Sequence, residues 1–201
     1  TLLFVQVDGK DAGILAAEDI LREDTIKAIQ DLRGLGFGSI KLISGDHPAA
    51  AEKIANKLGI DFEGGMSPED KIQAIKDSQA NGQHVVMIGD GINDAPALAQ
   101  ANVGIAMGHT GSDIAIETAH VALLREDWNL IPEAFLIANR TMRVVRMNFL
   151  FTGFYNLVGL SLAAAGLLPP AIAAAMQSIP DVGIMTNSAR LLYKRKNNLN
   201  K

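Results

Sequence analysis

Three short segments of the chain carry side chains that suit the handling of phosphate. Ser44-Gly45-Asp46 offers a hydroxyl and a carboxylate, Lys71 an ammonium, and Gly89-Asp90-Gly91-Ile92-Asn93-Asp94 two further carboxylates. Lysine and hydroxyl groups bind phosphate oxygens, and carboxylates hold Mg²⁺ against the same oxygens. Taken together, these residue types indicate phosphoryl transfer.

Each segment has an ordinary structural explanation when it is considered alone. Ser-Gly-Asp is common in turns, a lysine early in a helix is commonly a solvated charge, and residues 89–94 could form a loop with an Asx-turn. The segment 89–94 is the most specific, because glycines and acids coincide directly after an apolar strand. The order of the three, with 27 residues from Ser44 to Lys71 and 19 from Lys71 to Asp90, is more informative than any single member.

Alternating strand and helix patterns surround these segments. The apolar alternation on both sides of Asp8-Gly9 predicts a hairpin of Leu3–Val7 with Ala12–Leu15. Strands and helices then alternate, which implies crossover units and an α/β fold with a doubly wound parallel sheet. Ligands bind at the carboxyl ends of such strands, so we expect the three segments at one edge. The expected helices are Asp24–Leu35, Pro48–Leu58, Pro68–Gln79, Ala95–Ala101 and Ser112–Thr118, and the expected strands are Ser39–Ile43, His84–Ile88, Val103–Met107 and Val121–Leu124.

The distribution of charge divides the chain into two kinds of sequence. Between Met147 and Ala189, Asp181 is the only charged residue in 43 positions. Met147–Leu168 has 22 uncharged residues, enough for a helix to cross a hydrocarbon core of about 30 Å. After a Pro-Pro turn, Ala171–Leu192 is a second candidate transmembrane helix. The alternative is a buried hairpin of a soluble protein, but such a hairpin normally keeps a polar face.

Basic residues flank both outer ends of this expected hairpin. Arg140, Arg143 and Arg146 precede the first span, and Lys194-Arg195-Lys196 follows the second. The positive-inside bias therefore places both ends in the cytoplasm. We expect the lipid bilayer of the plasma membrane to be a partner of this part of the chain.

The composition excludes several classes of protein. The chain has 201 residues, 48% of them hydrophobic and 20% charged, which excludes a disordered segment. A net charge of −4 argues against a nucleic-acid partner, and zero cysteines exclude disulfide frameworks and thiol nucleophiles. The chain begins directly in a strand-like alternation, so we expect a piece of a longer protein. The expected division is 1–20 for the first hairpin, 21–128 for the α/β domain, 129–146 for a connecting helix, 147–168 and 171–192 for transmembrane helices, and 193–201 for a basic cytoplasmic tail.

The three segments resemble motifs of a known family. Ser44-Gly-Asp, Pro68-x-Asp-Lys71 and Gly89-Asp-Gly-Ile-Asn-Asp-Ala-Pro-Ala-Leu98 are similar to the later motifs of the phosphorylation domain of P-type ATPases, a haloacid-dehalogenase-like domain. The runs at 101–107 and 111–115 continue the resemblance, which covers essentially the whole chain. Residues 21–128 would then be the C-terminal part of the phosphorylation domain, and 1–20 the hairpin between it and the nucleotide-binding domain.

The resemblance implies a role for each matching residue. It implies that Asp90 coordinates Mg²⁺ with support from Asp94, that Lys71 contacts an aspartyl phosphate, and that Ser44 supplies a hydroxyl where the family usually has Thr. It implies Mg²⁺ as cofactor and ATP as substrate, with Mg²⁺ and Lys71 offsetting charge on the phosphoryl group. The residues expected around the phosphate and nucleotide are Gly45, Asp46, Gly91 and Asn93.

Other parts of the family pattern are missing from this chain. The Asp-Lys-Thr-Gly-Thr string that holds the family's nucleophile does not occur, nor does the Thr-Gly-Glu loop of the actuator domain. In family order both precede Thr1, so we expect the remaining domains of the same pump upstream, and no ATP turnover by this chain alone. The alternatives are a membrane-tethered, non-catalytic fragment and a stand-alone dehalogenase-superfamily phosphatase. The phosphatase needs an Asp-x-Asp pair, and Asp8-Gly-Lys-Asp11 has the wrong spacing.

The single hairpin after the α/β domain resembles the heavy-metal, type IB, transporters. Tyr155-Asn156 is similar to the Tyr-Asn pair of copper-type members, but Gln177 and Asp181 stand where those members carry Met and Ser. A thioether suits Cu(I), whereas a carboxylate suits a harder divalent ion. The transported heavy-metal cation is therefore expected to be copper-like or a divalent transition metal.

Asp181 is unusual because it is a charge inside an expected transmembrane helix. Such a charge costs about 2.5–3.5 kcal/mol on insertion scales, so it normally faces a partner or an ion pathway. Pro180 directly before it frees a backbone carbonyl that could add an oxygen ligand. The alternative is a protonated Asp181 bonded to Asn156 or Gln177. The residues expected to contact the transported ion are Asp181, Tyr155, Asn156, Gln177 and Met176.

Overall fold

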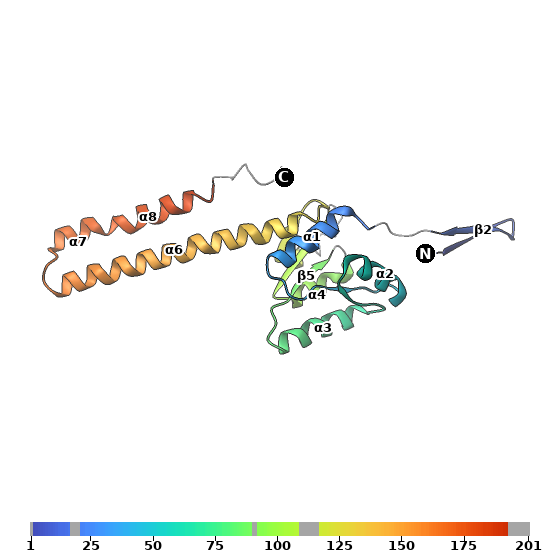
Figure 1. Ribbon diagram of the computed structural model, residues 1–201. Helices are drawn as coiled ribbons and strands as arrows, with labels where there is room; N and C mark the ends of the chain where they lie inside the picture. The colour runs from blue at the N-terminus through green and yellow to red at the C-terminus, as the bar shows by residue number, and fades with distance from the viewer. Residues whose placement is uncertain (1, 17–20, 90–91, 109–116, 193–201) are drawn as a thin grey trace. The chain divides into compact units, whose positions relative to one another are not determined.

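The computed structural model describes residues 2–16, 21–89, 92–108 and 117–192. The chain forms two compact units, Thr1–Pro132 and Glu133–Lys201 (Figure 1). The predicted helix at 112–118 falls mostly outside the described residues, as do Asp90, Gly91 and the basic tail.

The first unit begins with the predicted hairpin. Strand β1 (Leu2–Val7) pairs antiparallel with β2 (Lys10–Ala16), and Val7 faces Lys10 across the turn. Both turn residues have positive φ, 51° at Asp8 and 76° at Gly9. Asp-Gly suits this turn because aspartate tolerates and glycine freely adopts the left-handed conformation.

The other strands in the described part of the first unit pair in parallel. Strand β3 (Lys41–Ile43) pairs with β4 (Asp61–Glu63), and β5 (Val86–Gly89), β6 (Val103–Met107) and β7 (Val121–Leu123) form a three-stranded sheet in that order. The expected α/β fold with parallel strands is confirmed, although β4 was not predicted. Strand β4 is three residues long with acids at both ends, so its sequence has no strand-like hydrophobic pattern.

In the described residues, four α-helices connect these strands. They are α1 (Glu23–Gly34), α2 (Pro48–Leu58), α3 (Pro68–Ala80) and α4 (Ala95–Gln100), with a 3₁₀ turn η1 (Ile92–Asp94) before α4. Helices α2 and α3 each begin with proline at the first helical position, where the missing amide hydrogen has no helical partner in any case. Helix α2 ends at Gly59, whose φ of 63° closes the helix in the left-handed conformation.

The core of this unit lies between α3, α4 and the sheet of β5 and β6. Its buried members are Ile75, Met87, Ala97, Leu98, Ala101 and Ala106. Gly104 of β6 is required there, because a Cβ atom would overlap the backbone carbonyl of Leu98. Close contact between α4 and β6 thus holds the helix that follows the segment 89–94 against the sheet.

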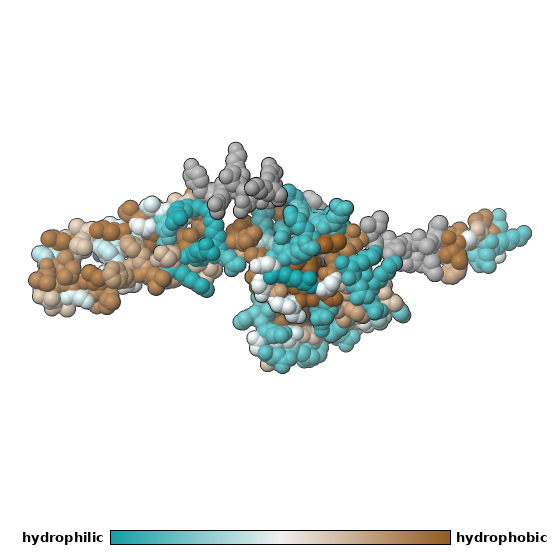
Figure 2. All heavy atoms as spheres, viewed as in Figure 1, coloured by the Kyte–Doolittle hydropathy of each residue, from teal (hydrophilic) through white to brown (hydrophobic). Residues whose placement is uncertain are grey.

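The second unit contains the apolar helices. Helix α6 (Leu130–Ala164) is continuous for 35 residues, so the expected connecting helix and first span are one element, ending at 164 instead of 168. Among the described helices, only α6 has the length and composition to cross a membrane. Figure 2 shows mostly hydrophobic side chains around the tip of this hairpin. Exposed hydrophobic side chains of α6 include Phe149, Leu150, Phe154 and Leu157.

The expected second span, 171–192, is two helices instead of one. Helix α7 (Pro170–Met176) and α8 (Ser178–Ala189) are separated at Gln177. The interruption lies within one turn of Pro180, which cannot donate a helical hydrogen bond. The helix expected over 171–192 is thus interrupted at Gln177, close to the proline that was expected to free a backbone carbonyl.

Helix α8 runs antiparallel against α6 with close side-chain contacts. Near one end, the Asn187 amide donates to Asn148 Oδ1 at 2.8 Å, and the Asn148 amide donates to Ser188 Oγ at 3.1 Å. Further along, a Cβ atom on Gly183 would lie 2.8 Å from the Phe151 ring, so glycine allows the helices to approach there. Small and amide side chains are the usual contacts between membrane helices.

Candidate functional site

Lys71 and Asp94 form the centre of the candidate site. The Lys71 ammonium lies 2.7 Å from Asp94 Oδ1, and both side chains are largely withdrawn from solvent. Lys71 comes from the first turn of α3, and Asp94 from the end of η1, where α4 begins. Two of the three segments predicted to share one edge of the sheet therefore meet through their charged groups.

The start of α3 is fixed by a reciprocal capping box. The Asp70 amide donates to Ser67 Oγ at 3.1 Å, and the Ser67 amide donates to Asp70 Oδ2 at 2.9 Å. The backbone and hydroxyl donors of Ser67 hold the pKa of the Asp70 carboxyl below its ordinary value of 3.8. Because Lys71 is the next residue, this cap also fixes the backbone from which its side chain reaches Asp94.

The Ser44 segment is joined to α3 through the backbone. The Met66 amide donates to the Ser44 carbonyl at 3.0 Å, and the Gly65 amide donates to the Asp46 carbonyl at 2.6 Å. Since residues 65 and 66 lead directly into Ser67, these bonds connect the first segment to the start of α3. The Ser44 hydroxyl itself accepts from the Asp46 amide at 3.1 Å and lies 3.3 Å from Asp46 Oδ2, so it forms a local turn.

Gly89 is a site residue whose specific role the sequence did not reveal. A Cβ atom at Gly89 would lie 2.8 Å from Asp94 Cβ and 2.9 Å from Asp94 Oδ2. The glycines beside Asp90 suggested only that the backbone approaches a ligand. The structure shows that Gly89 also makes room for the carboxylate that pairs with Lys71. No signal in a single sequence separates these two reasons for a glycine.

The donor chemistry around Asp94 is compatible with Mg²⁺. Mg²⁺ is commonly held by one or two carboxylates together with phosphate oxygens and water, and does not need a cage of protein ligands. Within the described ranges, no three His, Cys, Asp or Glu side chains gather as a metal site. Asp94 contributes one carboxylate, and Asp90, the other expected ligand, lies outside those ranges with Gly91. Asn93 lies in η1 and is exposed.

The residues expected around a transported ion lie in the helical hairpin. Tyr155 Oη donates to the Met176 carbonyl at 2.7 Å, which brings two of the five together. Asn156, Gln177 and Asp181 are exposed in the described hairpin. There, Asp181 makes no hydrogen bond with Asn156 or Gln177, the two partners considered for a protonated Asp181.

Comparison with known proteins places the first unit in a family. The family model of haloacid dehalogenase-like hydrolases matches residues 2–102, which include the Ser44 segment, Lys71 and Asp94. The chain belongs to this family. The haloacid dehalogenase-like fold expected from the motifs is thereby confirmed.

Similarity to metal-transporting P-type ATPases extends over nearly the whole chain. The chain is 39% identical over 196 residues to a manganese-exporting P-type ATPase of Mycobacterium leprae and to a zinc-exporting P-type ATPase of Mycobacterium marinum, with 97% of this chain covered in each case. It spans only 27% of the length of these relatives.

Solved structures give the same relationship. A zinc-transporting PIB-type ATPase in the E2.Pi state superimposes with a TM-score of 0.85 at 34% identity, covering 95% of this chain and 31% of that one. These matches confirm the relationship expected from the motifs, namely that this haloacid dehalogenase-like hydrolase is related to the heavy-metal P-type ATPases.

Proposed function

We propose that this chain supplies the C-terminal half of the phosphorylation site and the last membrane hairpin of an ATP-driven heavy-metal pump. The observation that carries the proposal is the Lys71–Asp94 ion pair, formed between two motifs that lie 23 residues apart. Its support is the similarity to metal-exporting P-type ATPases along nearly the whole chain. The nucleophilic aspartate of the pump would lie outside this chain, upstream.

In this proposal each residue of the site has a task at the phosphoryl group. Lys71 offsets the charge of the phosphoryl oxygens, and Asp94 holds the Lys71 ammonium in position for that contact. Asp90 and Asp94 would hold Mg²⁺, which supplies further positive charge at the same oxygens. Ser44, with its turn through Asp46, would offer a hydroxyl donor to the same phosphoryl group.

The transported ion is proposed to be a divalent transition metal such as Mn²⁺ or Zn²⁺. Two observations support this class over Cu(I): the relatives include manganese and zinc exporters, and the hairpin carries Asp181. A carboxylate oxygen is a suitable ligand for a hard or borderline divalent ion. Asn156 and Gln177 could add amide oxygens, because each directly follows one of the two residues, Tyr155 and Met176, that join the helices by a hydrogen bond.

The same hairpin supports a proposed placement in the membrane. Helix α6 and the α7–α8 pair would cross the bilayer, with Arg140, Arg143 and Arg146 at the cytoplasmic side. This orientation leaves the first unit in the cytoplasm, where ATP and Mg²⁺ are available, and the plasma membrane is the proposed location.

The test is metal-dependent ATP hydrolysis by the pump that contains this chain, reconstituted in lipid vesicles. Mn²⁺ or Zn²⁺ should stimulate hydrolysis more strongly than Cu(I). Asp181→Ala should abolish metal stimulation while phosphorylation by inorganic phosphate persists. Thr186→Ala is the matched control, because Thr186 is exposed on the same helix and its hydroxyl donates only to the Val182 carbonyl, at 2.8 Å. Unchanged metal stimulation in Asp181→Ala would remove Asp181 from the proposed ion site.

A further inference from the structure

Pro180 leaves one carbonyl of the hairpin without its helical donor. In an α-helix each carbonyl accepts from the amide four residues later, so the partner of the Met176 carbonyl would be the amide of residue 180. Proline has no amide hydrogen. Gln177 keeps right-handed helical angles, φ −60° and ψ −25°, so the interruption is a missing hydrogen bond and not a reversal of the chain.

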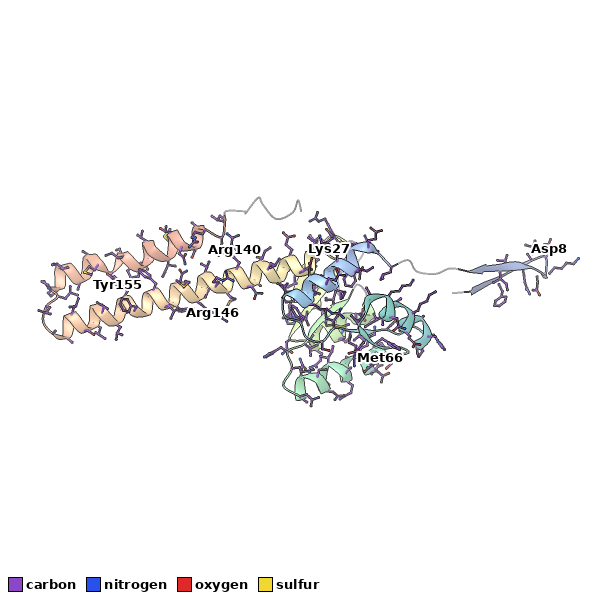
Figure 3. All side chains as sticks on the ribbon, in the orientation of Figure 1. Asp8, Lys27, Met66, Arg140, Arg146 and Tyr155 are labelled. Atoms are coloured by element: carbon purple, nitrogen blue, oxygen red, sulfur yellow. The ribbon has the colours of Figure 1, made fainter. Side chains whose placement is uncertain are left out.

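Tyr155 supplies the missing donor from the neighbouring helix. Its hydroxyl donates to the Met176 carbonyl at 2.7 Å, and the side chain is partly buried. Figure 3 shows Tyr155 on the side of α6 that faces α7 and α8. A carbonyl without a donor is costly in the hydrocarbon region, because no water is present to replace the lost bond.

The Tyr155 ring is held in place by packing along the same side of α6. Its centroid lies 6.2 Å from that of Phe151, with the ring planes tilted by 39°. Phe151 in turn lies against Gly183 of α8, where a Cβ atom would come within 2.8 Å of the ring. These contacts between α6 and α8 hold the ring whose hydroxyl bonds to the Met176 carbonyl.

We propose that Tyr155 is a positioning residue, which takes the place of the absent Pro180 amide and so holds the α7–α8 interruption in a fixed geometry next to Asp181. Asp181 directly follows Pro180 in α8 and lies five residues after Met176. Its direction therefore depends on how the preceding turn is held. The inference rests on the proposed function in two respects, that the hairpin lies in the membrane and that Asp181 contacts the transported ion. It assigns Tyr155 a role different from the direct ion contact expected from the sequence.

A double substitution separates positioning from direct ion contact. Tyr155→Phe removes the hydroxyl and keeps the ring, while Pro180→Ala restores an amide that can satisfy the Met176 carbonyl. In the reconstituted pump, Tyr155→Phe should raise the metal concentration for half-maximal ATP hydrolysis by about 5-fold to 10-fold, the scale of one hydrogen bond. It should leave the maximal rate nearly unchanged. In the Pro180→Ala background, Tyr155→Phe should have no further effect.

A second measurement does not depend on pump activity. The thermal midpoint of the detergent-solubilised protein, without metal or ATP, should fall on Tyr155→Phe and should not fall when the same change is made in Pro180→Ala. If Pro180→Ala does not yield folded protein, Pro180→Gly restores the amide in the same way. Ser161→Ala is the matched control, because the Ser161 hydroxyl donates within its own helix to the Leu157 carbonyl at 2.8 Å. This control should change neither the thermal midpoint nor the metal concentration for half-maximal ATP hydrolysis.

Two results would overturn the inference. One is a Tyr155→Phe defect that is equally large with and without the Pro180 amide, which would show that the hydroxyl contacts the ion or another group directly. The other is a Tyr155→Phe protein with an unchanged thermal midpoint. A pump without metal-stimulated hydrolysis would contradict the proposed function instead, and the thermal comparison would still decide the role of Tyr155.

Discussion

The Nζ atom of Lys71 lies 2.7 Å from Oδ1 of Asp94, and the two side chains expose only 14% and 15% of their surface. Because the pair is largely withdrawn from water, removing one partner leaves the other charge buried and poorly solvated, which is strongly destabilising. The pair also joins the start of α3 to the segment between β5 and α4. In the proposed function, both the stability and the chemistry of the site depend on this pair.

Replacing Lys71 by Met should expose this dependence. Met has a similar length and no charge, so Asp94 keeps its surroundings and loses its partner. We expect the free energy of unfolding to fall by about 1–3 kcal/mol and phosphoenzyme formation in the pump to be lost. Lys71→Arg retains the charge and should preserve most of the stability. Chemical denaturation of the three proteins measures the difference, and equal stability of the Met and Lys forms would contradict it.

Gly89→Ala should displace Asp94 without changing any charge. The new methyl group would lie within 3 Å of the Asp94 side chain, so the carboxylate must move away from Lys71. We expect about 1–3 kcal/mol of destabilisation, the usual range for an overpacked position, together with lower phosphoenzyme yield. Gly34→Ala is the matched control, because no atom lies within 4 Å of its Cβ position in α1. Gly34→Ala should leave the free energy of unfolding unchanged or raise it by about 0.5–1 kcal/mol.

The capping box at the start of α3 predicts a pH dependence of stability. The pKa of Asp70 is lower in the folded chain than its ordinary 3.8, so the unfolded chain binds the proton more readily. Its contribution is therefore fully present above the unfolded pKa and is lost as the pH falls through the folded pKa. Asp70→Asn removes this titration. The stability difference between wild type and Asp70→Asn should be larger at pH about 7 than at pH about 3, measured by urea unfolding. An equal difference at both pH values would contradict the prediction.

The contact between Asn148 and Asn187 should be measurable as a coupling between α6 and α8. The two amides share a 2.8 Å hydrogen bond, and Asn148 also donates to Ser188. In a double-mutant cycle with Asn148→Ala and Asn187→Ala, we expect a coupling of about 0.6–1.7 kcal/mol, typical of hydrogen bonds between membrane helices. The same cycle between Ser161→Ala and Asn187→Ala should give no coupling. Additive effects of the two asparagine substitutions would show that the contact does not stabilise the hairpin.

The sequence predicted the bounds of an element correctly where proline, glycine or a short apolar run defines them. Helix α2 has the predicted bounds, because Pro48 suits the first helical position and Gly59 adopts the left-handed closing conformation. Strand β6 likewise covers the predicted Val103–Met107, a short apolar run buried in the core. Strand β4 has no such marker: it forms because Leu42 and its neighbours in β3 offer it a parallel partner.

The sequence predicted that Lys71 and Asp94 lie at one edge of the sheet, but it did not predict the contact between them. Strand order brings Lys71 and Asp94 to one edge, but their pairing depends on the capping box and on Gly89, which act through three-dimensional packing. In the hairpin, the pattern around Pro180 indicated a freed carbonyl, yet the hydroxyl that satisfies it belongs to another helix. Contacts of this kind, such as Tyr155 with Met176, depend on the register between helices, and a single sequence does not specify that register.

The most direct test of the central proposal is phosphoenzyme formation from ATP labelled at the γ-phosphate, compared between the wild-type pump and Asp94→Ala. The change removes the carboxylate that holds Lys71 and leaves the membrane hairpin untouched, while Thr186→Ala serves as a control outside the site. The proposal predicts a metal-dependent, acid-stable label in the wild type and in Thr186→Ala, and its loss in Asp94→Ala. A normal level of label in a folded Asp94→Ala protein would contradict it.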